Sequence, residues 1–167
     1  MSSGKNRKRN IGLELLVIFL SIIGLMLLIY LVLILSFQDG DRSISETMSI
    51  ARRISQSIYT DPTEDEIRTI SRMLRYIAHL GLFFIVGFVT TFVSMVIFRK
   101  YYRILGVMLS GGICYLLAYY TEYYKQFIEG RHFHMTDVGL NWLGSAVGIA
   151  CMVISYFMNR LLVEMSS

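Results

Sequence analysis

Polar and ionisable residues recur four positions apart near the ends of three long apolar stretches of this sequence. Three pairs have this spacing, namely Arg75 with His79, Glu122 with Gln126, and Asp137 with Asn141. Residues four apart share one face of a helix, so each pair would form a polar stripe. Arg131 lies between the second and third pairs. Since ionisable groups at membrane depth tend to face the protein interior and one another, we expect these side chains to form one polar cluster.

Two kinds of chemistry suit such a cluster. In the first, Arg75 and Arg131 hold a phosphate or carboxylate through charge-assisted hydrogen bonds, and Gln126 and Asn141 orient the ligand. A lipid or lipid-linked anion is the expected ligand, because the cluster would lie beside lipid-facing helices.

In the second, the cluster is an active site. His79 acts as general acid or base, and Glu122 or Asp137 orients it. No nucleophile accompanies these residues, since Cys114 and Cys151 both fall inside apolar stretches. The sequence therefore favours a binding protein over an enzyme.

Each residue also has a purely structural interpretation. Glu122 and Arg131 could form an ion pair that closes the loop between them. Thr136 or Asp137 could cap a helix, and Gln126 and Asn141 could form interhelical hydrogen bonds. His132 and His134 are expected in a solvated loop. The spacing of His79, Glu122 and Asp137 matches no known metal pattern, so neither a metal nor another cofactor is expected.

Four long runs of the sequence lack lysine, arginine, aspartate and glutamate, and they predict the elements that position the cluster. They are residues 15–38, 76–98, 104–121 and 138–159. A helix needs about 20 mainly apolar residues to cross a bilayer, and these runs are apolar all round. The sequence predicts an all-α polytopic membrane protein with a single domain, residues 1–167, packed as a four-helix bundle. Its spans are expected at about 12–37, 77–98, 104–121 and 139–159.

The flanking charges predict the orientation. Residues 5–9 and 99–103 are rich in lysine and arginine and lack acids, whereas the other two loops have no basic excess. By the positive-inside rule both basic segments face the cytoplasm, so both termini are cytoplasmic and the cluster is on the outer side. The formal charge of +4 is therefore a topology signal and does not indicate a nucleic-acid partner.

A fifth helix, amphipathic and interfacial, is expected at about 43–59 in the outer loop. Apolar residues recur there at helical spacing: Ile44, Met48, Ala51, Ile54 and Ile58. Asp61-Pro62 ends it, and Thr63 with Glu66 forms a capping box for a helix that continues into the second span. Gly144 and Gly148 in the fourth span predict close helix packing.

The sequence resembles the VanZ-like family over about residues 12–158. The most specific segment is Glu122-x-x-x-Gln126-x-x-x-Gly130-Arg131, followed by Thr136-Asp137-Val138, Asn141, Gly144 and Gly148. Arg75-x-x-Ala78-His79 and Leu35-Ser36-Phe37-Gln38 also fit. The chain departs from the usual family pattern at Tyr123-Tyr124, where acids are common, and at Phe83, where tyrosine is common.

The resemblance implies a multi-pass protein of the bacterial cytoplasmic membrane. Some VanZ-like proteins are linked to low-level resistance to the lipoglycopeptide teicoplanin. The resemblance therefore implies a role at the cell envelope but does not specify a mechanism, which has to be argued from the residues.

Overall fold

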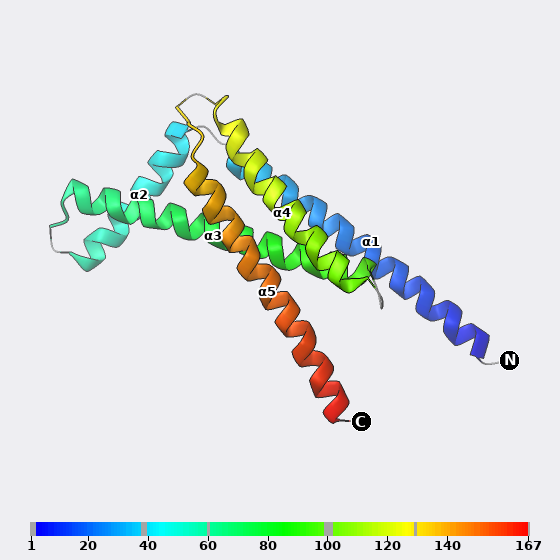
Figure 1. Cartoon of the computed structure of the whole chain (residues 1–167). Helices are drawn as coiled ribbons and strands as arrows, with labels where there is room; N and C mark the ends of the chain where they lie inside the picture. The colour runs from blue at the N-terminus through cyan, green and yellow to red at the C-terminus, as the bar shows by residue number, and fades with distance from the viewer. Residues whose placement is uncertain (1–2, 38–39, 60, 99–101, 129, 167) are drawn as a thin grey trace.

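The computed structural model describes residues 3–37, 40–59, 61–98, 102–128 and 130–166. These residues form five α-helices and no strand (Figure 1): α1 Ser3–Ser36, α2 Gly40–Ile58, α3 Glu64–Ile97, α4 Arg103–Lys125 and α5 Met135–Met165. Four of them, all except α2, are long and apolar enough to cross a membrane. The prediction of an all-α protein with four spanning helices and a separate amphipathic helix is confirmed. Helices α1 and α3 each end one residue before the predicted end of the span.

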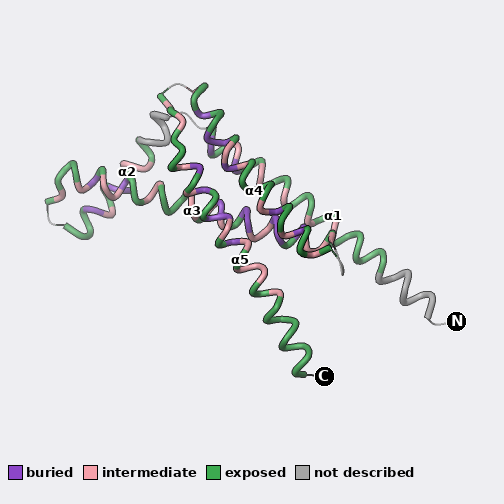
Figure 2. Tube along the Cα trace, viewed as in Figure 1, coloured by how far each residue is buried: buried purple, intermediate pink, exposed green. Residues whose placement is uncertain are grey.

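Helix α3 is the centre of the fold. Among the described residues it contacts each of the other four helices, and α2 contacts α3 alone. A small apolar core joins α1, α3, α4 and α5 through Val32, Phe83, Val86, Cys114, Ala118 and Val138. Most large apolar side chains of α1 and α5 are exposed instead (Figure 2). Exposed apolar surface on this scale marks contact with a membrane.

The most extensive packing joins α3 and α5, and it depends on glycine. A Cβ atom on Gly144 would lie 2.6 Å from the carbonyl oxygen of Leu80, and one on Gly148 would overlap the carbonyl oxygen of Phe84. Gly87 on α3 has the same relation to the backbone of Ser145. Because no side chain separates the two helices at these points, their backbones touch, as the spacing of Gly144 and Gly148 predicts.

Helices α2 and α3 form a hairpin that projects away from the other helices (Figure 1). The turn ends in the predicted capping box: Thr63 N–H donates to the Glu66 carboxylate at 2.8 Å, and Glu66 N–H donates to Thr63 Oγ1 at 3.4 Å. Ala51 and Ile67 are buried in the hairpin. With 34 residues, α3 is about 51 Å long, so it is longer than a bilayer is thick and carries the hairpin at its start.

Candidate functional site

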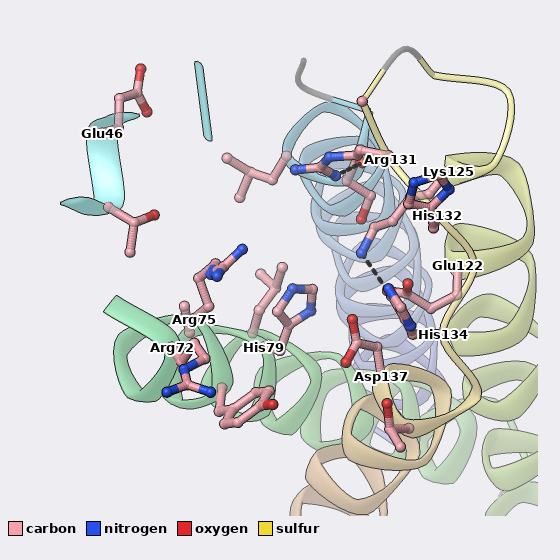
Figure 3. Close-up of a pocket in the computed structure, with 18 of the residues that line it drawn as sticks. Glu46, Arg72, Arg75, His79, Glu122, Lys125, Arg131, His132, His134 and Asp137 are labelled. Atoms are coloured by element: carbon pink, nitrogen blue, oxygen red, sulfur yellow. Dashed lines mark hydrogen bonds and ion pairs between the residues drawn. The ribbon is translucent and has the colours of Figure 1, made fainter. Parts of the chain in front are cut away.

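A cavity of about 810 Å³ lies at the end of the molecule where α1 and α4 finish and α5 begins. Its walls come from all five helices and from the loop between α4 and α5. Ten ionisable side chains line it (Figure 3): Glu46, Arg72, Arg75, His79, Glu122, Lys125, Arg131, His132, His134 and Asp137. At least one residue of each predicted polar stripe therefore lines the same cavity.

A chain of hydrogen bonds crosses three helices at one wall of this cavity. His79 Nδ1 on α3 lies 3.0 Å from Asn141 Oδ1 on α5. Asn141 Nδ2 donates to Glu122 Oε1 on α4 at 3.3 Å, and Lys125 Nζ donates to the same oxygen. Asn141, Glu122 and Lys125 are buried, whereas His79 is half-buried and borders the cavity. This chain fixes the relative positions of α3, α4 and α5 at the cleft.

The structural interpretation of Glu122 and Arg131 as an ion pair is wrong. Glu122 pairs with Lys125, one turn away on α4. Arg131 instead donates from Nη1 to the carbonyl oxygen of Ser36 at 2.7 Å. That bond ties the loop to the last turn of α1, where the final carbonyls of a helix lack intrahelical donors. Gly130, with a φ of 74°, supplies the left-handed turn that leads into Arg131.

Arg75 differs from the other cations of the cavity. It is half-buried and makes no hydrogen bond or ion pair with any described residue. Arg72, one turn earlier on α3, donates to Thr69 Oγ1 at 3.3 Å and pairs with no carboxylate in the described part of the chain. The wall of the cavity formed by α3 thus presents two guanidinium groups that can receive an anion.

The start of α5 differs from the expectation that Thr136 or Asp137 caps it. The N-cap is His134, which makes no side-chain capping bond, and Thr136 and Asp137 lie inside the first turn. The helix begins earlier because the His134 carbonyl already accepts from Asp137 N–H at 3.0 Å. The side chain of Asp137 is left to line the cavity, where it and His79 point into the same space (Figure 3).

Two candidates, Gln126 and Asn141, are absent from the cavity lining. Asn141 is buried behind it, where it contacts His79 and Glu122. Gln126 has no such contact. It is exposed and forms the C-cap of α4, beyond the turn that carries Glu122. His132 and His134 are exposed, as expected of a solvated loop, and they also form part of the cavity rim.

Apolar residues of the spanning helices also line part of the cavity. Leu82 and Ile85 follow His79 on α3, and Leu35 faces them from the last turn of α1. Beside the cavity, aromatic rings of α4 contact one another in a row: Tyr119, Tyr120, Tyr123, Tyr124 and Phe127. Tyrosine belts of this kind lie at the level of lipid headgroups. The cavity therefore offers charges at one end and an apolar wall at the other.

Three charged residues of the lining were not predicted from the sequence. Lys125 could have been found, because three residues after Glu122 is a helical pairing distance. Arg72 precedes Arg75 by one turn and could have been found in the same way. Glu46 reaches the cavity only because α2 folds back along α3. No local sequence pattern predicts this packing of the two helices.

Metal chemistry finds no support in this arrangement. Within the described ranges, no group of three or more histidine, cysteine, aspartate or glutamate side chains is placed to hold a metal ion. His79, Glu122 and Asp137 all border the cavity, but Glu122 is bonded to Lys125 and Asn141.

Four long apolar helices around a polar cleft define the class: this is an α-helical membrane protein. The sequence model of the VanZ/LLP1 family matches residues 20–157, and the chain belongs to this family. The match contains all seven predicted site residues. No curated protein and no solved structure matches the chain.

Proposed function

We propose that this protein binds a lipid or lipid-linked anion in the cleft, at the outer face of the bacterial cytoplasmic membrane. The observation that carries the proposal is Arg75, a half-buried guanidinium that lines the cavity without an ionic partner among the described residues. Partly desolvated guanidinium groups bind phosphate and carboxylate strongly and in a defined orientation.

The balance of charge favours an anion over a cation. Four cationic side chains and three acidic ones line the cavity, and one acid, Glu122, is already paired with Lys125. The apolar wall formed by Leu82 and Ile85 suits the start of an acyl or polyprenyl chain. An amphiphile with an anionic headgroup fits both ends, whereas a free ion would leave the apolar wall unused.

Orientation supports an outer site. Helices α1 and α4 both finish at the cleft, so their first residues lie at the opposite end. In the sequence, the basic segments 5–9 and 99–103 belong to the starts of these two helices, and the positive-inside rule puts such segments in the cytoplasm. Both termini lie at the end of the molecule away from the cleft (Figure 1). The cleft then faces the outer leaflet, where glycopeptide antibiotics act. An effect on susceptibility to teicoplanin-type compounds is part of the proposal, as membership of this family implies.

The test compares two charge reversals at the same end of the molecule. Arg75→Glu is expected to reduce the anionic lipid that co-purifies with the protein, measured by native mass spectrometry, about tenfold. It should also abolish any change in teicoplanin susceptibility of cells that express the protein. Arg53→Glu is the matched control, because Arg53 is exposed on α2 and does not line the cavity. Equal lipid retention in the two variants would refute the proposal.

Arg131→Glu is a weaker test on its own. It removes a cation from the cavity and also breaks the bond to Ser36 that holds the loop. A loss of lipid in that variant would not separate ligand binding from loop position, so it belongs with Arg75→Glu as a double variant.

A second function is favoured by the hydrogen bond between His79 and Asn141. A base that a neighbouring group orients, and that faces a cavity, is the arrangement general acid–base catalysis requires. In this alternative the protein is an intramembrane enzyme that acts on an envelope lipid intermediate, with His79 as acid or base. A single-turnover assay on labelled lipids distinguishes the two, because His79→Ala would then keep binding and lose turnover. Absence of turnover in the wild-type protein leaves the binding function.

A further inference from the structure

The amide of Asn141 has only one orientation that satisfies both of its neighbours. Glu122 Oε1 accepts hydrogen bonds, so the amide nitrogen must face it, as the 3.3 Å contact from Asn141 Nδ2 requires. The amide oxygen is then left facing His79 Nδ1 at 3.0 Å. Lys125, which donates to the same carboxylate oxygen, keeps Glu122 an acceptor.

This orientation determines which nitrogen of His79 carries the proton. An amide oxygen can only accept, so Nδ1 must donate and therefore bears the hydrogen. In a neutral imidazole the other nitrogen is then an acceptor. His79 lines the cavity, and Nε2 makes no hydrogen bond to any described residue. We infer that Asn141 and Glu122 hold His79 in the Nδ1–H form, so that Nε2 is unprotonated and can accept a hydrogen bond from a donor group of the ligand.

The inference specifies the ligand beyond its negative charge, and that step rests on the proposed function. A donor for Nε2 is either a hydroxyl or an ammonium group. Four cationic side chains line the cavity against three acidic ones, so its net positive charge disfavours an added ammonium group and leaves a hydroxyl unaffected. The ligand class is therefore an anionic amphiphile whose headgroup carries a hydroxyl.

A second acceptor strengthens this choice. Glu122 is 1% exposed, and its Oε2 has no hydrogen-bond partner in the described part of the chain. A buried carboxylate oxygen without a donor is costly, and Glu122 borders the same cavity as His79. Two acceptors in one cavity suit a headgroup with more than one hydroxyl, such as a glycerol or a sugar.

The protonation state is tested first, without any ligand assumption. The full chain is labelled with ¹⁵N-histidine, placed in phosphatidylcholine nanodiscs, and examined by NMR at a pH where the ring is neutral. His79→Gln identifies the signal of His79 among the three histidines. The Nδ1–H form is expected to dominate in the wild-type protein. A dominant Nε2–H form, which free histidine prefers, would overturn the inference directly.

Two variants connect the result to Asn141. Asn141→Leu removes the acceptor, so His79 is expected to shift toward the Nε2–H form. Asn141→Asp keeps an acceptor at this position and is expected to preserve the Nδ1–H form. Because the wild-type spectrum is decisive by itself, poor folding of either variant leaves the inference testable.

The ligand is tested with two lipids of equal charge. Phosphatidylglycerol has a hydroxyl-bearing headgroup, and phosphatidylethanol has the same phosphodiester without a hydroxyl. One added hydrogen bond predicts about a fivefold preference for phosphatidylglycerol, measured by competition in native mass spectrometry. His79→Phe should lose this preference and still bind both lipids better than phosphatidylcholine.

The outcomes separate the two proposals. Equal binding of both anionic lipids, above phosphatidylcholine, overturns the hydroxyl inference and leaves the proposed anion site intact. Binding of both no better than phosphatidylcholine overturns the proposed function, while the NMR result still decides the protonation state of His79.

Discussion

Glu122 and Lys125 carry the most deeply buried charges of the cleft, with 1% and 7% of their side chains exposed. Each stabilises the other, because an isolated charge in such a place would lack both water and a partner. Asn141 adds a third polar contact to the pair. The pair belongs to the scaffold of the cleft, and the α3 wall with Arg72 and Arg75 supplies the guanidinium groups available to a ligand.

A double-mutant cycle measures how strongly the charges of Glu122 and Lys125 stabilise each other. Lys125→Met is expected to cost about 3–5 kcal/mol of unfolding free energy, because it leaves Glu122 as a buried charge without its ion-pair partner. Glu122→Gln should have a similar effect on Lys125. The double variant should recover much of the loss, since it removes both charges. Reversible unfolding in mixed micelles, followed by circular dichroism, gives the three values.

The exposed pair Arg52 and Glu64 is the control. It has an N–O distance of 3.1 Å, but both side chains are more than half exposed. Arg52→Met should therefore change stability by less than about 1 kcal/mol. If the double variant of the buried pair lost as much as the sum of its single variants, the two charges would not depend on each other.

Residue spacing predicted several residues that line the cleft but not the bonds that they make. The four-residue intervals placed Arg75 with His79 and Asp137 with Asn141 because helical periodicity is local. The partner of Arg131 is a backbone carbonyl at Ser36, and these residues are far apart in the sequence. Sequence periodicity cannot predict a contact of that kind, because the contact depends on where α1 ends relative to the loop.

At the scale of elements, helix identity was predictable and helix packing only partly so. Long apolar runs and the Thr63 capping box determine where α3 lies, because both are local signals. The amphipathic pattern of α2 predicts one buried face but not what covers it, and the structure shows that α3 does. The early start of α5 at Met135 lacked a signal, since His134 has no capping side chain that a sequence could reveal.

The glycine contacts between α3 and α5 predict that a larger side chain there destabilises the packing of the two helices. Gly148→Ala would place a methyl group against the Phe84 carbonyl, so the helices must separate. The expected cost is about 1–3 kcal/mol of unfolding free energy, measured in the same micelles. Gly139→Ala is the control on the same helix, because nothing lies within 4 Å of its added Cβ. That change should be neutral or stabilising by up to about 1 kcal/mol, since alanine favours helices. Equal melting of the two variants would contradict the close contact.

The whole molecule has an asymmetry that matters for function. The cleft lies at one end of the spanning helices, and both termini lie at the other (Figure 1). The sequence predicts that both termini share the cytoplasmic side, because the N-terminal segment is basic and the number of predicted spans is even. What the sequence could not predict is that α2, through Glu46, also reaches the cleft, because that depends on a hairpin packed through tertiary contacts.

Labelling of single cysteines tests which side the cleft faces. Gln56→Cys and Ser166→Cys place exposed thiols on α2 and at the end of α5, in a background where Cys114 and Cys151 are replaced by alanine. A membrane-impermeant maleimide is expected to label position 56 in intact spheroplasts and position 166 only after permeabilisation. The reason is that the positive-inside rule predicts a cytoplasmic location for the basic segments and therefore an outer location for the opposite helix ends. The reverse pattern would place the cleft in the cytoplasm, where a lipid-linked anion of the outer leaflet could not reach Arg75.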